Sequence, residues 1–252
     1  MTRKVHVHLV TPVVTKGIRD MNEIAPFARP DLVFSQSELD IGPPSIECEF
    51  DEALAVPDTI AKAIAAEQAG ADAIIIDCMG DPGLHPVREA LHIPVLGPGE
   101  TTMHWAAMLG HRFSIVTVLE SVKPMLTSMT RRYGVDSKFA SCRVVDVPVL
   151  ELVERFAEVQ QRLAEQARAA VLEDDAHAII LGCTGFIGCA STIDAFLKAD
   201  GITVPVLDPI PVTVCMAEAM VRAGLSHSRR TYPTPRPKAN IGFAMPTGWP
   251  AP

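Results

Sequence analysis

The segment ADAIIIDCMG at residues 71–80 recurs, with few changes, as AHAIILGCTG at residues 176–185. Further segments match in the same order along the chain and at a nearly constant spacing. Such a pattern indicates an internal duplication, so we predict two similar halves related by a pseudo-twofold axis. The other matching pairs are IPVLGP (93–98) with VPVLDP (204–209), and LVT (9–11) with IVT (115–117).

Both copies of the repeated segment contain a continuous apolar run, which is typical of a strand buried on both faces of a sheet. Strand-like and helix-like patterns alternate along the chain, as in parallel sheets with crossover helices. We predict an α/β fold with two Rossmann-like domains, each with a parallel sheet, and an active site in the cleft between them. The predicted strands cover residues 4–14, 71–77, 93–97, 112–118, 143–150, 176–182 and 204–208. The predicted helices cover residues 57–70, 99–110, 120–133, 151–172 and 211–224. Residues 15–50 are expected to be irregular.

The duplication also suggests how the chain divides into domains. We expect residues 1–98 together with 205–225 to form the first domain, and residues 99–204 to form the second. Residues 226–252 contain six prolines and several basic residues. This composition is typical of an extended arm, which we expect to pack on a neighbouring molecule or to stay mobile.

The composition excludes several classes of protein. Apolar residues make up 48% of the chain and charged residues 21%, which is typical of a globular protein and not of a disordered one. The formal net charge of −8 disfavours nucleic acid and anionic membranes as partners, since both attract basic surfaces. No apolar run reaches the roughly 18 residues of a membrane span.

The N-terminal residues and the cysteine count bear on location. The apolar segment after Met1–Lys4 is interrupted by His6 and His8, and no small-residue cleavage site follows, so we expect no signal peptide. Six cysteines in 252 residues are too sparse for a disulfide scaffold, so we expect a cytoplasmic protein. The two histidines lack further ligands at metal spacing, and we expect no metal site.

Cys78 and Cys183 are the strongest candidate catalytic residues. Both follow the carboxyl end of a predicted parallel strand, where α/β proteins bind ligands, and each has a glycine two residues later. If the halves face each other, one thiol lies on each side of the cleft. In a two-base racemase, one thiolate removes the α-proton from one face of a carbon and the opposite thiol protonates the other face.

Residues near these cysteines are candidates for substrate binding. Glycines let backbone amides approach a ligand closely, and hydroxyl or carboxyl groups in the same loops can bind a carbonyl or an N–H group. Gly97–Gly99 is not a dinucleotide fingerprint, and no phosphate-binding loop of the Walker type occurs. The candidates are Ser45, Gly80, Asp81, Thr117, Thr184 and Gly185.

Several motifs resemble the aspartate/glutamate/hydantoin racemase superfamily, and within it the hydantoin and allantoin racemase branch. The resemblance covers about residues 40–238. It implies a cofactor-independent racemase with one catalytic cysteine from each domain, acting on a small molecule and assembling as a homo-oligomer. The motifs are DCMGDPGL (77–84), IPVLGPGE (93–100), RFSIVTV (112–118), ILGCTGF (180–186), GPPSIE (42–47), GLSHS (224–228), Tyr232, Pro233 and Lys238.

The first strand departs from the pattern of this branch, in which an Asn-Pro-Asn-Thr-Ser-like motif contributes to the substrate site. Here the corresponding residues are Thr11, Pro12, Val13, Val14 and Thr15, so both amide side chains are missing. We keep Thr11 and Pro12 as candidate binding residues and expect a hydantoin-like or amino-acid-like substrate. Three alternatives stay open: a maleate-type cis–trans isomerase, a decarboxylase that uses a cysteine, and a non-catalytic binding protein.

Overall fold

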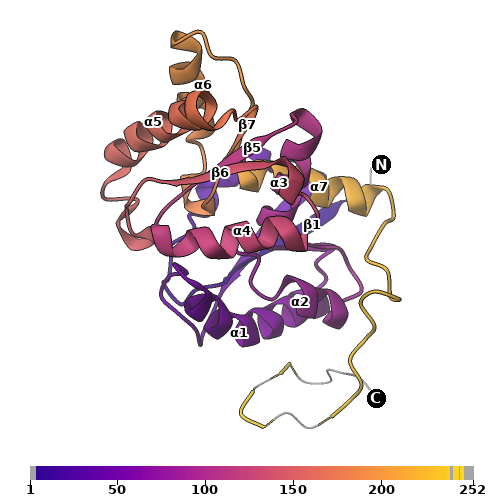
Figure 1. Cartoon of the computed structure of the whole chain (residues 1–252). Coiled ribbons are helices and arrows are strands. Elements are labelled where there is room, and N and C mark those ends of the chain that lie inside the picture. The colour runs from indigo at the N-terminus through magenta and orange to yellow at the C-terminus, as the bar shows by residue number, and fades with distance from the viewer. Residues whose placement is uncertain (1–3, 239–240, 244, 247–252) are drawn as a thin grey trace.

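The computed structural model describes residues 4–238, 241–243 and 245–246, and contains two four-stranded parallel sheets (Figure 1). The strand order is β2-β1-β3-β4 in the first sheet and β6-β5-β7-β8 in the second. The identical order confirms the predicted α/β fold with two similar halves. The strands are β1 Val5–Thr11, β2 Leu32–Glu38, β3 Ala73–Ile76, β4 Val95–Leu96, β5 Phe113–Thr117, β6 Phe139–Val144, β7 Ala178–Leu181 and β8 Val206–Leu207.

Helices cover both faces of each sheet, and the central strands are therefore buried on both sides. Every residue of β3 is buried, with Ile74 and Ile76 in one apolar cluster and Ile75 in the other. None of the helices that the structure describes is long and apolar enough to cross a membrane. The helices are α1 Glu49–Gln68, α2 Leu84–Ala90, α3 Pro98–Leu109, α4 Lys123–Arg132, α5 Phe156–Asp174, α6 Ala190–Ala199 and α7 Pro209–Arg222.

The two halves exchange a helix. α3 follows the last strand of the first sheet but packs on β5 and β7 of the second, whereas α7 follows the second sheet and packs on β1, β3 and β4 of the first. α3 and α7 also pack against each other. β8 pairs with β7 in the second sheet, and α7 begins directly after it at Pro209.

Several elements differ from the sequence-based expectations. β2 lies within the segment expected to be irregular, at the edge of its sheet; it is apolar in its first half and polar in its second, and it is half-buried after Leu32. α1 begins at Glu49 and contains Pro57, because three acidic residues in its first turn favour the start of a helix there. β6 ends at Val144, since Asp146 adopts a left-handed conformation and Pro148 opens a short 3₁₀ helix. The helices α2 and α6 were not expected.

The first part of the C-terminal arm contacts α2 of its own chain. Arg229 donates hydrogen bonds to the carbonyl oxygens of Arg88, Glu89 and Leu91, at the end of α2. A cation at this end satisfies carbonyls that have no partner within the helix. After Arg222 the described residues form no helix or strand, and Figure 1 shows the arm extending away from the two sheets.

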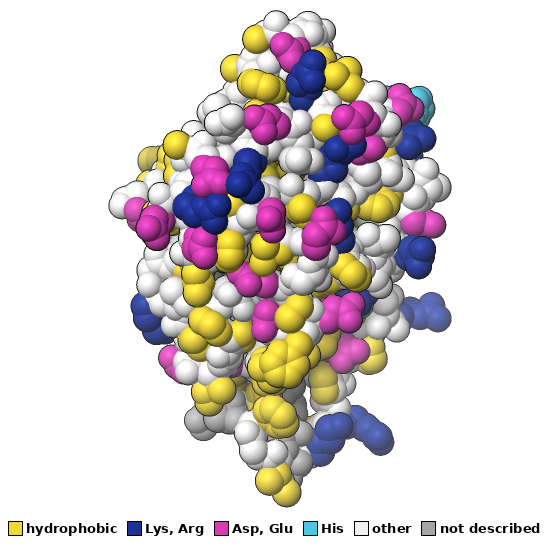
Figure 2. All heavy atoms as spheres, turned by 60° about the vertical axis from the view of Figure 1, so that its left-hand side comes forward, with side chains coloured by type: hydrophobic (Ala, Val, Ile, Leu, Met, Phe, Trp, Pro, Cys, Tyr) yellow, Lys and Arg dark blue, Asp and Glu magenta, His cyan; other side chains and the backbone are white. Residues whose placement is uncertain are grey.

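The surface carries charges of both signs. On the face shown in Figure 2, acidic and basic side chains are interspersed and do not form a single basic field. This distribution is typical of an ordinary solvated surface.

Candidate active site

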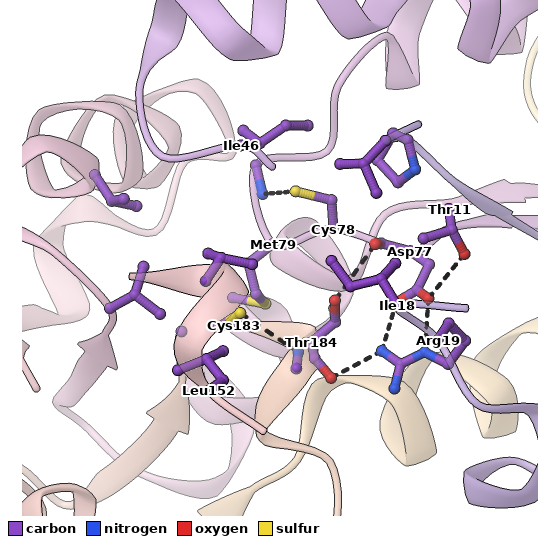
Figure 3. Close-up of a pocket in the computed structure, with 18 of the residues that line it drawn as sticks. Thr11, Ile18, Arg19, Ile46, Asp77, Cys78, Met79, Leu152, Cys183 and Thr184 are labelled. Carbon is purple, nitrogen blue, oxygen red and sulfur yellow. Dashed lines mark hydrogen bonds and ion pairs between the residues drawn. The ribbon is translucent and has the colours of Figure 1, made fainter. Parts of the chain in front are cut away.

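A cavity lies between the carboxyl ends of the two sheets and contains both predicted catalytic cysteines (Figure 3). It encloses about 860 Å³ of empty space, part of it open solvent. Both halves contribute to its walls, as expected for a site in the cleft between them. Most of the wall is apolar, formed by Val13, Ile18, Ile46, Met79, Val118, Val122, Met125, Val149, Leu152 and Val153.

Cys78 and Cys183 have matching local geometry. Each Sγ atom accepts a hydrogen bond from the backbone N–H two residues later, at 3.5 Å from Gly80 and 3.4 Å from Gly185. A Cβ atom on Gly185 would lie 3.1 Å from a methyl group of Leu152, so glycine leaves the amide room to approach the sulfur. The duplicated segments thus place two thiols in equivalent loops of one cavity.

Burial weakens the acidity of both thiols. It raises the pKa of Cys183 to about 11, although the hydrogen bond from Gly185 and the charge of Arg19 act in the opposite direction. Burial also raises the pKa of Cys78 well above its usual range, and the nearby Cys183, Glu52 and Asp81 raise it further. Both sulfurs therefore favour the neutral thiol over the thiolate.

A buried arginine, which the sequence analysis did not single out, connects the two cysteine loops. Arg19 pairs with both carboxylate oxygens of Asp77, with Nε–Oδ2 and Nη2–Oδ1 distances of 2.8 and 2.9 Å. Its Nη2 atom also donates to the carbonyl oxygen of Thr184 at 2.8 Å, and Nη1 donates to Glu23. Since Asp77 precedes Cys78 and Thr184 follows Cys183, one guanidinium group positions both loops.

The predicted binding residues fall into two groups. Thr11, Pro12, Gly80, Thr184 and Gly185 line the cavity. Thr11 donates a hydrogen bond to Asp77, and Thr184 donates one to the Asp77 carbonyl, both at 3.3 Å.

Ser45, Asp81 and Thr117 are buried and are not among the lining residues. Thr117 donates a hydrogen bond of 3.0 Å to the carbonyl oxygen of Gly182 and so holds the end of β7. Ser45 precedes the lining residue Ile46. Thr117 therefore supports the site through this hydrogen bond, and Ser45 is the sequence neighbour of a residue that lines it.

Asp81 fixes the loop after Cys78. Its carboxylate accepts hydrogen bonds from the N–H groups of Gly99 and Glu100, at the start of α3, and from the Tyr133 hydroxyl. Burial raises the pKa of Asp81 to about 7. A Cβ atom on Gly99 would lie 2.5 Å from the Met79 carbonyl oxygen, so this position requires glycine. The Gly-Pro-Gly motif therefore serves close packing around Asp81.

The histidines of the first strand lie elsewhere. His6 and His8 are hydrogen-bonded to Ser35, and His8 is also bonded to Ser37, at the edge of the first sheet. Among the described residues, no group of three or more His, Cys, Asp or Glu side chains is placed to hold a metal ion.

Comparisons with known proteins agree with this architecture. The Asp/Glu/Hydantoin racemase family model matches residues 14–217. A hydantoin racemase from Pseudomonas sp. (strain NS671) is 37% identical over 92% of this chain and 91% of its own. Two solved structures of allantoin racemases are each 32% identical to this chain. The structure from Klebsiella pneumoniae has a TM-score of 0.87, and the match covers 95% of this chain and 97% of that one. The structure from Pseudomonas fluorescens has a TM-score of 0.83, and the match covers 94% of this chain and 100% of that one. The chain belongs to the Asp/Glu/hydantoin racemase family.

Proposed function

We propose that this protein is a cofactor-independent racemase that inverts the carbonyl-activated ring carbon of a 5-substituted hydantoin. Cys78 and Cys183 would act as the two proton-transfer groups. The observation that carries the proposal is the presence of two equivalent thiols, from the two halves, in one cavity. The hydantoin and allantoin racemases similar to this chain support the same class of reaction.

The reaction needs only proton transfers. A thiolate removes the hydrogen at C5, and the electron pair moves into the adjacent carbonyl to form an enolate. The opposite thiol then gives its proton to the other face of C5, which regenerates the carbonyl with inverted configuration. The roles of the two sulfurs are thereby exchanged, and no electron acceptor is consumed.

The polar end of the cavity favours a neutral ring. Arg19, Asp77 and Glu23 lie there with a combined formal charge of −1, so a free carboxylate on the ligand would meet no uncompensated cation. A guanidinium has five N–H donors, and one on Nη1 has no acceptor among the described residues. That donor suits a ring carbonyl, and the nearby carboxylates suit ring N–H groups.

The rest of the cavity favours an apolar substituent at C5. Val122, Met125 and Leu152 lie on the wall and offer no hydrogen bonds from their side chains. A ureido group, as in allantoin, would lose hydrogen bonds to water on entering such a surface. We therefore propose an aliphatic or aromatic 5-substituent.

The same considerations weigh against the alternatives. A maleate-type isomerase or a decarboxylase would take a dicarboxylic acid, which the acidic polar end disfavours. A binding protein without activity has no need for two matched thiols. None of these three alternatives has a specific observation in its favour.

The test is proton NMR in deuterated buffer with single enantiomers of 5-benzylhydantoin, 5-isobutylhydantoin and allantoin, and with free α-amino acids. We expect the C5 proton signal of the apolar hydantoins to disappear while optical rotation decays. The variants Cys78→Ser and Cys183→Ser should each lose racemisation, with Cys142→Ser, a cysteine outside the cavity, as the matched control. Racemisation that survives either of the first two substitutions would refute the two-thiol mechanism.

A further inference from the structure

We infer that Arg19 and Glu52 make the two-thiol site electrically asymmetric, so that Cys183 ionises before Cys78 in the unliganded protein. This inference rests on the proposed function and deepens it, since it states which of the two sulfurs loses its proton first. Glu52 becomes a positioning residue that acts through Cys78, although it does not line the cavity.

The immediate surroundings of the thiols do not distinguish them. Each sulfur accepts one backbone N–H, at nearly equal distances of 3.5 and 3.4 Å. Each follows the third strand along the chain of its half, in sheets of identical strand order. An electrical difference must therefore come from elements around the repeated loops.

The first source of asymmetry is the connection between the first two strands of each half. Between β1 and β2 this connection places Arg19 and Glu23 at the cavity, whereas between β5 and β6 it places the neutral Val122 and Met125 there. The side chain of Arg19 is only 4% exposed and is fixed on the carbonyl of Thr184, directly after Cys183. Its positive charge is thus held close to one sulfur.

Other charged groups around Cys183 leave this effect in place. Asp77 and Glu47 act on Cys183 with the opposite sign to Arg19. Asp77 is engaged by Arg19 through two hydrogen bonds, and Glu47 accepts the N–H of Val149 at 2.7 Å. Both carboxylates are therefore partly neutralised by donors of their own.

The second source of asymmetry is Glu52, in the first turn of α1. Its Oε2 atom lies 3.6 Å from the position of a Cβ atom on Gly80, the residue whose N–H contacts Cys78. No hydrogen bond or ion pair to the Glu52 carboxylate is found in the described part of the chain. Burial raises the pKa of Glu52, the charge of Arg132 lowers it, and the charge of Glu49 raises it further. Asp81 adds a second carboxyl on the side of Cys78.

This arrangement defines which thiol ionises first. In the singly ionised site, a thiolate at Cys183 is favoured by Arg19, whose effect on Cys183 exceeds that of its partner Asp77, and the thiol at Cys78 avoids an additional anion beside Glu52. The substrate enantiomer whose hydrogen faces Cys183 then meets the more easily formed thiolate. After turnover of that enantiomer, a proton must move from Cys183 to Cys78 to restore this form of the site.

The test measures the reactivity of each thiol separately. The protein is treated briefly with iodoacetamide at several pH values between about 8 and 11, and alkylation at each cysteine is quantified by peptide mass spectrometry. Because the rate follows the thiolate fraction, comparing one thiol between variants removes differences in access. We expect Glu52→Gln to accelerate alkylation of Cys78 by about three- to tenfold and to leave Cys183 within about twofold.

The control is Glu49→Gln, which removes an exposed carboxylate from the same turn of α1 and should leave both rates unchanged. Arg19→Met should slow alkylation of Cys183. If Arg19→Met does not fold, the inference is tested by the alkylation rates of Glu52→Gln alone. An unchanged Cys78 rate in Glu52→Gln, or a lower apparent pKa for Cys78 than for Cys183, would overturn the inference. None of these measurements depends on racemisation. If the protein did not racemise hydantoins, the proposed function would be refuted, and the inference about the two thiols would still be tested by the alkylation rates.

Discussion

The ion pair between Arg19 and Asp77 can be tested by a double-mutant cycle. The two side chains are 4% and 1% exposed and share two hydrogen bonds of 2.8 and 2.9 Å. Arg19→Met leaves the Asp77 carboxylate buried without its counter-charge. Asp77→Asn removes the negative charge and one of the charge-assisted acceptors. The double variant removes both charges together.

The magnitudes follow from the burial of the pair. Removing one partner of a buried ion pair costs about 3–5 kcal/mol, because the other charge remains desolvated and uncompensated. The double variant has no such charge, so it should be no less stable than the less stable of the two single variants. The coupling free energy should therefore be at least about 3 kcal/mol. Glu23→Gln, which removes the 40% exposed partner of the same guanidinium, should cost less than about 1 kcal/mol.

The assay is urea unfolding of all four proteins and of the Glu23→Gln control, followed by circular dichroism. The losses of unfolding free energy caused by Arg19→Met and by Asp77→Asn are summed and compared with the loss in the double variant. If the two values agree within about 0.5 kcal/mol, the two side chains are not coupled. That result would refute the conclusion that this ion pair holds the two cysteine loops together.

Three further outcomes are expected. Gly99→Ala should lower the free energy of unfolding by more than about 2 kcal/mol in urea titrations, because its Cβ atom would overlap the Met79 carbonyl oxygen. The pKa of Asp81 is raised from its ordinary value to about 7, so the folded state binds this proton more tightly than the unfolded state. Stability relative to Asp81→Asn should thus be highest below about pH 4 and fall by about 4 kcal/mol as pH rises to 7; a flat difference would contradict this sign. Arg229→Ala should expose the arm to limited proteolysis while racemisation persists, since, within the described part of the chain, this guanidinium donates hydrogen bonds to the end of α2 and to the arm itself.

Local patterns in the sequence predict the repeated framework well. The apolar runs before Cys78 and Cys183 and the recurrence of Pro-Val-Leu identify four of the eight strands and their order of appearance. β2 was not predicted from these patterns because it is an edge strand with an interrupted apolar pattern. Its residues Ser35 and Ser37 are hydrogen-bonded to His6 and His8 of β1.

The polar end of the cavity depends on contacts that local patterns do not reveal. Arg19 lies 58 residues from Asp77 and 165 from Thr184 in the chain, within a segment without periodicity. The one available signal was an acidic residue directly before Cys78, where the second copy has Gly182. Asp81 and Thr117 were expected at the cavity from their position at strand ends. Instead, Asp81 is held by the start of α3, and Thr117 is bonded to the carbonyl oxygen of Gly182.

The exchange of α3 and α7 has a consequence for how the chain could be divided. A fragment ending near residue 110 would carry α3 without the strands it covers, and its own sheet would lack α7. The complementary fragment would have the reverse defect. Each piece therefore holds the missing layer of the other, and cleavage between them should give two polypeptides that regain structure only when mixed.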